Sequence, residues 1–218
     1  MTRGAVPGGA GGLLYCRPMR LRLGPVLASA VLLVAACSTT TSSTGKAFAR
    51  PDSSTLELGK LSEAEVRARF GEPQSLAWPL INGRTVKTLS YSYAESPSDV
   101  KTVPVRVMVF MFADGILVGH QYLSSFSDDP TDFDETRVGQ ITRGQTTAAH
   151  VVDLIGRPAG EFIHPLAKAT DGRAYVYNYS LTQTDAASGR LTTRVKTLIV
   201  NFDTAGVVSD VDLSMTGK

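Results

Sequence analysis

The chain has 218 residues, of which 43% are hydrophobic and 19% are charged, so it is long enough for one or two small domains with hydrophobic cores. Its formal charge of +2 includes four arginines in the first 37 residues, a segment that contains no acidic residue. The remainder has 18 basic and 20 acidic residues, and this balance excludes a nucleic-acid-binding protein that relies on positive charge.

The first 36 residues have the parts of an export signal. Arginines precede the apolar run GPVLASAVLLVAA, whose 13 residues are fewer than the roughly 20 that a membrane-spanning helix needs. Met19 is an alternative start, because the sequence from there onward is by itself a compact signal. We therefore expect residues 1–36 to be a cleaved signal peptide.

The signal ends in Val34-Ala35-Ala36-Cys37, which resembles the lipobox of bacterial lipoproteins. That resemblance implies a diacylglyceryl group on Cys37, cleavage before it and acylation of the new amino terminus, so membrane lipid is one expected partner. Ser38, which follows, favours outer-membrane sorting in Gram-negative lipoproteins and implies an anchored protein that faces the periplasm. The alternative is an ordinary secretory signal with an accidental cysteine.

The segment after Cys37 is rich in Ser and Thr and poor in large apolar residues. This composition predicts a flexible tether over residues 37–54. No cysteine follows Cys37, so disulfide bonds and cysteine-based metal sites are excluded from the folded part.

The folded part contains an internal repeat. LELGKLSEAEVRARFGEP (56–73) aligns without a gap with ITRGQTTAAHVVDLIGRP (141–158), and later strands recur in the same order. We therefore predict one copy over 55–126, an acidic linker over 127–137 and a second copy over 138–218.

Each copy begins with a short helix. Ser62 and Glu65 form a capping box before EAEVRAR, and Gly71 ends that helix. Thr147 and Gly156 occupy the same places in the second copy. Four strands are expected after each helix, near 75–81, 86–95, 103–113 and 116–123, and near 160–165, 173–182, 193–203 and 206–214. The predicted fold class is α+β: two tandem repeats, each with one or two short helices packed on a small antiparallel sheet of about four strands.

These motifs resemble a known family. GQT (144–146), IGRP (155–158), YVYNY (175–179) and NFDTAGVVSDVDLS (201–214) are similar to the SmpA/OmlA lipoproteins, which include BamE, a small subunit of the β-barrel assembly machine. The tandem arrangement resembles the β-lactamase inhibitor protein fold. BamE has one copy and this chain has two, so the resemblance implies the fold and leaves membership in that machine open.

Sequence motifs of catalysis are absent. There is no GxSxG, no phosphate-binding loop and no close pair of histidines with metal-ligand spacing. The acidic run 127–135 has oxygen ligands but lacks the order of a calcium loop, so a solvated linker is the interpretation we favour over a calcium site. We expect no enzyme activity and no cofactor.

The expected partner is a protein of the cell envelope. Alternating tyrosines on two strands are either core residues or an aromatic binding surface. The strand over 105–112 is apolar on both faces, which indicates either a covered strand or an exposed docking patch. The candidate partner-binding residues are Tyr91, Tyr93, Val107, Val109, Met111, Tyr175, Tyr177 and Tyr179.

The sequence therefore predicts an outer-membrane lipoprotein that acts as a non-enzymatic scaffold or accessory factor in envelope integrity or outer-membrane protein assembly. One alternative is a periplasmic inhibitor or sensor that grips its target in a concave sheet. Another is a weak enzyme or a small-ligand carrier.

Overall fold

The computed structural model describes residues 41–97, 102–184 and 189–217, all of which belong to the unit Ser38–Lys218. The predicted signal peptide and Cys37 lie outside the described residues. No helix within the described ranges is both long enough and apolar enough to cross a membrane.

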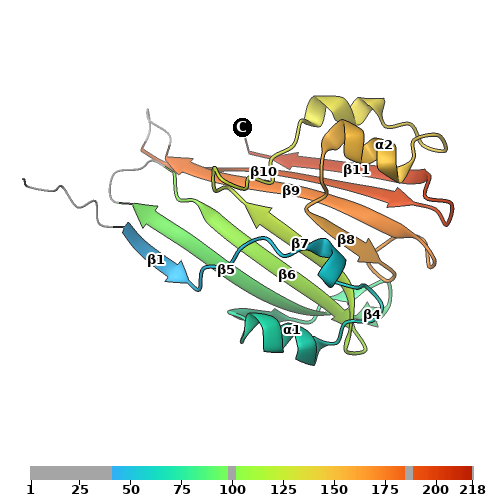
Figure 1. Cartoon of the computed structure of the whole chain (residues 1–218). Helices are drawn as coiled ribbons and strands as arrows, with labels where there is room; N and C mark the ends of the chain where they lie inside the picture. The colour runs from blue at the N-terminus through green and yellow to red at the C-terminus, as the bar shows by residue number, and fades with distance from the viewer. Residues whose placement is uncertain (1–40, 98–101, 185–188, 218) are drawn as a thin grey trace, which may run out of the picture. The chain divides into compact units, whose positions relative to one another are not determined.

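One antiparallel sheet dominates this unit (Figure 1). Its neighbouring strands follow the order of the chain: β5 (Lys87–Pro97), β6 (Val105–Ala113), β7 (Ile116–Ser124), β8 (Gly160–Ile163), β9 (Arg173–Thr184), β10 (Leu191–Phe202) and β11 (Val208–Thr216). Both β1 (Thr41–Gly45) and β2 (Ser75–Ala77) pair with the outer edge of β5. The predicted strands are thus present within a few residues of their expected bounds, in a structure that is mostly sheet, with one exception. The strand expected over 75–81 is split into β2 and a two-residue strand, Leu80–Ile81, that belongs to a separate two-stranded sheet.

Both helices cover the same face of the sheet. Helix α1 (Glu63–Phe70) buries Val66 in a cluster with Phe110, and α2 (Ala148–Ile155) buries Val151 in a cluster with Val200. Phe110 and Val200 lie in one row of register partners that runs across β6, β7, β8, β9 and β10, and partners in such a row share a face. In Figure 1 the two helices accordingly lie on the same side, over opposite ends of the strand order.

The helix caps agree with the sequence prediction. Ser62 and Glu65 form the capping box of α1, and the Thr147 hydroxyl accepts a hydrogen bond from the backbone N–H of His150 at the start of α2. Gly71 and Gly156 end the helices at φ values of 82° and 99°, a region that glycine enters without a steric penalty.

The two halves also share long-range contacts. The Tyr91 hydroxyl donates to the carbonyl of Gly71 at 2.9 Å, and the Tyr177 hydroxyl donates to the carbonyl of Gly156 at 3.0 Å. The halves differ in the small hairpin of β3 (Leu80–Ile81) and β4 (Arg84–Thr85), which occurs in the first half only among the described strands. The tandem repeat is therefore matched in its helix, caps and main strands, and the first half carries additions.

The halves are joined by a narrow strand pairing. Between β7 and β8 the register partners are Gly119 with Phe162, His120 with Glu161, and Gln121 with Gly160. Gly160 has no room for a side chain, because a Cβ there would lie 2.1 Å from the carbonyl oxygen of His120. These few residues make one continuous sheet out of two halves.

The tether predicted over residues 37–54 is wrong for its second part. Strand β1 pairs with β5, and Phe48 packs against the core cluster that contains Val66 and Phe110. The Arg50 guanidinium donates to the carbonyl of Pro158 at 2.6 Å. The edge of β5 offers unpaired backbone N–H and C=O groups, which a Thr-containing segment can satisfy by adding a strand. Two large side chains in an otherwise small and polar segment then fix it against the body.

The acidic run is more than a solvated linker. Arg106 of β6 donates to Asp128 and Asp129, at 2.8 Å and 3.1 Å. Lys196 of β10, whose side chain is 4% exposed, pairs with Glu135 at 2.8 Å and with Asp132. The first part of the run is thus held by the first half and the second part by the second half, because a buried ammonium requires carboxylate partners.

Two short 3-10 helices, η1 (Ser53–Thr55) and η2 (Glu135–Gln140), precede the two α-helices.

Candidate functional site

Two of the five candidate tyrosines, Tyr91 and Tyr177, are buried on the helix-covered face. Tyr177 is 2% exposed and belongs to the core of the second half, so its prediction as a partner-binding residue is wrong. Burial raises the pKa of its hydroxyl, which donates to Gly156. Tyr91 is 4% exposed and packs against Phe70 and Phe110, and its remaining exposed edge lines a cavity.

The other three tyrosines are half-buried on the same face. Tyr93 stacks on Phe126 and donates to Glu95 at 2.7 Å. Tyr175 packs edge-on against Phe202, and Tyr179 lies beside Lys196, with 5.6 Å from the ammonium to the ring centroid. Each tyrosine has a partner within the fold, so these rings do not combine into one open aromatic surface.

The apolar strand residues Val107, Val109 and Met111 face the other side of the sheet. Met111 is 7% exposed because the β3–β4 hairpin and the segment 164–172 cover that end of the face, so its prediction as a partner-binding residue is wrong. The Asn82 side chain fixes the hairpin by donating to the carbonyl of Pro165 at 2.8 Å. Val107 and Val109 remain half-buried, and Val109 packs partly against the covering cluster.

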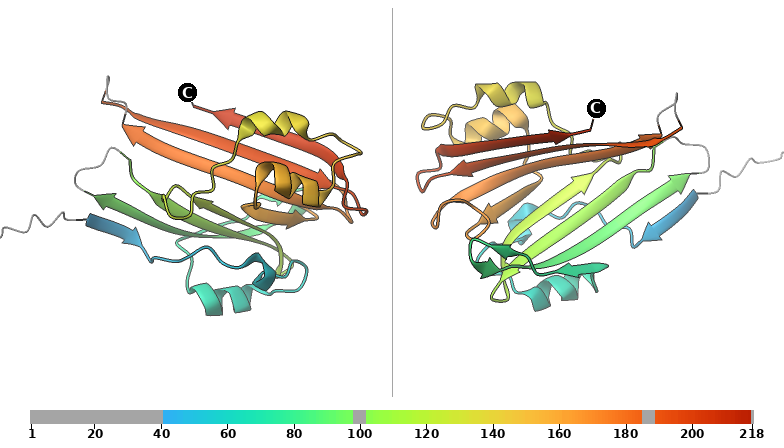
Figure 2. Two further views of the ribbon diagram at one scale, coloured as in Figure 1. Left: turned by 45° about the horizontal axis from the view of Figure 1, so that its top comes forward. Right: turned by 180° about the vertical axis from the view of Figure 1, so that it is seen from behind.

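Beyond this cover, and beyond Asp212 at its edge, which pairs with Lys168, the open rows of the face hold no charged side chain among the described residues. Figure 2, right, shows the sheet from this side, with the hairpin over one end. Register partners place only hydroxyl, amide and apolar side chains in its rows: Ser92, Val107 and Leu123; Ala94 and Val105; Asn178, Thr197 and Ser214; Ser180, Val195 and Thr216. Asn178 is 7% exposed, and its side-chain oxygen has no hydrogen-bond partner within the described part of the chain.

An exposed apolar stripe lies at the edge of the first half. Leu76, Trp78 and Leu80 alternate along the chain from β2 to β3 and are 42%, 58% and 73% exposed. Sequence reasoning missed this stripe because residues 75–81 read as an ordinary strand. The signal was present in the alternation LAWPL, which holds the only tryptophan of the chain. An exposed tryptophan between two exposed leucines is unusual on a surface without a partner.

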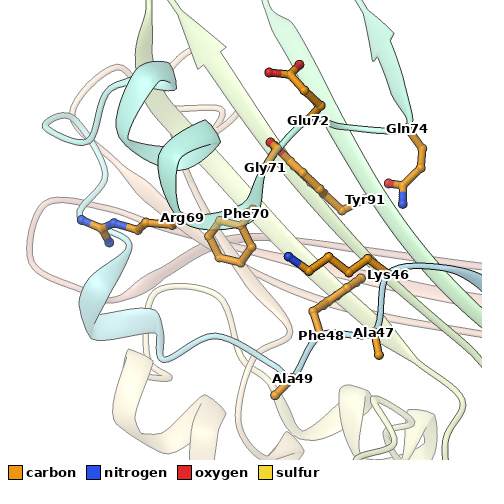
Figure 3. Close-up of a pocket in the computed structure, with 10 residues that line it drawn as sticks. All are labelled: Lys46, Ala47, Phe48, Ala49, Arg69, Phe70, Gly71, Glu72, Gln74 and Tyr91. Atoms are coloured by element: carbon orange, nitrogen blue, oxygen red, sulfur yellow. The ribbon is translucent and has the colours of Figure 1, made fainter.

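A cavity of about 530 Å³ opens on the helix-covered side of the first half (Figure 3). The segment before η1 forms one wall with Lys46 and Phe48, and the end of α1 forms the other with Arg69 and Phe70. Tyr91 lies at its floor. The remaining lining residues are Ala47, Ala49, Gly71, Glu72 and Gln74.

Titratable groups do not converge on a catalytic arrangement in the described ranges. No three side chains of His, Cys, Asp or Glu there lie close enough to hold a metal ion. His120 is 5% exposed, and burial lowers its pKa from 6.5 to about 4, with a further contribution from nearby Arg50. His120 is therefore a neutral core residue near neutral pH.

Comparisons with known proteins give one distant likeness. No family model matches the chain, and no curated protein matches it. Among solved structures, the chain is similar to a protein from Streptococcus mutans that is described as a candidate β-lactamase inhibitor protein, with 13% identity and a TM-score of 0.37 over 70% of this chain and 82% of the other. This likeness is to a protein that is not described as an enzyme, and it establishes no shared function. The resemblance to SmpA/OmlA lipoproteins stays a prediction.

Proposed function

We propose that this chain is a protein-binding module without a catalytic role, and that it docks its partner through the stripe Leu76, Trp78 and Leu80. The observation that carries the proposal is the exposure of these three side chains, between 42% and 73%. Tryptophan is among the residues that contribute most to binding when a partner buries it, and burying a leucine adds about 1.5–3 kcal/mol. Together they supply an anchor that needs no rearrangement of the fold.

The backbone beside the stripe supports the same role. β2 pairs on one side with β5, and no described strand pairs with its other edge. Such an edge accepts an extended segment of a partner as an added strand, with its main chain hydrogen-bonded to β2 and its side chains against the stripe.

The cellular setting of the proposal comes from the sequence. The lipobox favours a lipid on Cys37, and Ser38 favours the outer membrane. We therefore propose an anchored, periplasm-facing accessory or scaffold for an envelope protein, in envelope integrity or in outer-membrane protein assembly. Membership in the SmpA/OmlA family is part of this proposal.

The uncharged open face favours a second candidate function. A target segment laid across Val107, Leu123 and Val195 would cover no charged side chain of the described strands, so its binding there would not desolvate an unpaired ion. That arrangement suits an inhibitor or sensor that holds its target on the sheet. The two candidates place the partner on different surfaces, and this difference makes them separable.

A photoreactive amino acid placed at single positions in the full-length lipoprotein tests both. The expected result is that positions 78 and 80 each give adducts in intact membranes. The adduct from position 80 should be lost when Trp78 is replaced by Asp in the same protein. Ala149, which is exposed on α2, is the matched control position. Adducts from position 107 alone would favour the inhibitor or sensor. A crosslinking yield at positions 78 and 80 that is no higher than at position 149 would contradict the proposal that the partner docks on the stripe.

A further inference from the structure

The cavity beside α1 has an aromatic floor and a cationic rim. Tyr91, Phe70 and Phe48 supply the rings, and Lys46 and Arg69 supply the positive charge. Figure 3 shows the Lys46 side chain extending toward the Phe70 ring. Its volume of about 530 Å³ is within the range of roughly 300–1,000 Å³ that is typical of binding pockets.

The two charges on the rim differ in what they already contact. Arg69 donates to the backbone carbonyl of Thr55 at 3.0 Å, and Lys46 makes no ion pair or hydrogen bond with any described residue. Glu72 also lines the cavity, but Arg67 pairs with its carboxylate. Arg69 also lies near Glu65, so the charge without an acidic partner among the described residues is that of Lys46, and this charge favours an anionic ligand.

The second half shows what lies over the equivalent tyrosine. There the Phe133 ring packs on Tyr177, with 6.0 Å between ring centroids. The Lys196 ammonium lies 5.0 Å from the centroid of the Phe133 ring, donates to the Phe133 carbonyl at 2.7 Å and pairs with Glu135. An aromatic residue between carboxylates thus docks on this unit, with a cation that contacts both the ring and the acids.

The same combination occurs a second time in the fold. The Arg106 guanidinium lies 4.2 Å from the centroid of the Phe126 ring and pairs with Asp128 and Asp129. Both parts of the acidic run are therefore held on the helix-covered face by the same kind of contact. In each, one cation contacts a phenyl ring and pairs with carboxylates close to that ring in the sequence.

Over Tyr91 that ring is missing. Phe48 stands 85 residues before Phe133, the spacing of the helix repeat, yet its ring packs on Tyr122. The aromatic partners of Tyr91 among the described residues are Phe70 and Phe110, neither of which comes from the segment before the helix. The cavity occupies the space beside Tyr91, between Phe48 and the end of α1.

We propose that this cavity binds an acidic–aromatic segment of a partner protein, with an aromatic side chain against Tyr91 and Phe70 and flanking carboxylates on Lys46 and Arg69. The inference names the chemistry of a second contact and rests on the proposed function only in that the ligand is a polypeptide. It uses no residue of the stripe Leu76, Trp78 and Leu80.

A synthetic peptide tests the site directly. The probe is a blocked, fluorescently labelled DDPTDFDE, the sequence of residues 128–135, added to the full-length protein in detergent and followed by fluorescence anisotropy. Replacing its Phe by Ala is expected to weaken binding about tenfold or more, because the buried ring supplies most of the apolar contact. The uncharged peptide NNPTNFNQ is expected to bind weakly and to lose the salt dependence of the acidic one.

Protein variants locate the site. Lys46→Glu and Arg69→Glu are each expected to weaken binding about threefold or more, whereas Lys60→Glu, an exposed cation of the same half, should leave it unchanged. A peptide carrying benzophenone in place of Phe should label residues 46–49 or 69–74. Labelling at 133 or 196, equal binding by all three variants, or no binding of the peptide would each overturn the proposal. None of these outcomes affects the adducts expected from position 78, so failure of this site is distinct from failure of the docking stripe.

Discussion

Replacing His120 by Gln should remove most of a pH dependence in the stability of the fold. His120 lies on β7 opposite Phe110 and Glu161, at the junction of the two halves, and is 5% exposed. Burial, with a contribution from Arg50, lowers its pKa from 6.5 to about 4. The folded state therefore keeps the imidazole neutral where the unfolded state is already protonated.

The sign and size of the effect follow from proton linkage. Between the two pKa values the unfolded state binds more protons, so stability is complete above pH 6.5 and falls as the pH drops toward about 4. The full difference is about 3 kcal/mol, and about 2 kcal/mol of it is already lost at about pH 5, where most carboxylates are still ionised. A neutral Gln at position 120 does not titrate, so this loss should disappear.

Urea denaturation at about pH 7.5 and about pH 5 measures the difference for the wild type, for His120→Gln and for His150→Gln. The comparison of each variant with itself at two pH values cancels any constant cost of the substitution. His150 is exposed on α2, so its replacement should leave the wild-type pH dependence intact. An undiminished loss of stability in His120→Gln would refute the reasoning that links this buried imidazole to the pH response.

Three further predictions concern single residues. Tyr177→Phe removes the hydrogen bond to the carbonyl of Gly156 and should lower the free energy of unfolding by about 1 kcal/mol in urea denaturation, and a cost near zero would contradict the role of that bond. Gly160→Ala should lower the free energy of unfolding by at least about 2 kcal/mol, because its Cβ would lie 2.1 Å from the His120 carbonyl oxygen. Gly139 has open space around it, so Gly139→Ala should leave the melting temperature unchanged in a thermal melt that shows a clear decrease for Gly160→Ala. Cys37→Ser should move the protein from the detergent phase to the aqueous phase in a phase-partition assay, and an unchanged distribution would argue against lipidation at Cys37.

The local signals in the sequence were reliable because they depend on local physics. A capping serine, a glycine with positive φ and a strand turn are decided by a few neighbouring residues, so α1, α2 and the strand limits follow directly from them. The spacing between the two GxP motifs then located the second half from the first. The same spacing extends back to Phe48 and Phe133, which would have indicated that the segment before the helix packs on the body.

What the sequence could not supply is which face of each strand is covered. Period-two alternation places Val109 and Phe110 of β6 on opposite faces but does not reveal that helices cover one face and a hairpin covers one end of the other. The acidic run read as a solvated linker because its cations, Arg106 and Lys196, lie 22 and 61 residues away from the carboxylates they bind. The exposure of the stripe at Trp78 was missed for the same reason, since a strand at a sheet edge and one at its centre share one pattern.

The pairing of β7 with β8 over a few residues has a consequence for the half-molecule. A first half expressed alone would end in the uncovered edge of β7, and a second half would begin with the uncovered edge of β8. Identical halves would then tend to join edge to edge, as strand-exchanged homodimers or as larger aggregates. In the intact chain each half is the covalently supplied partner of the other, so the molecule is a dimer within one polypeptide, and assembly of its two parts does not depend on protein concentration.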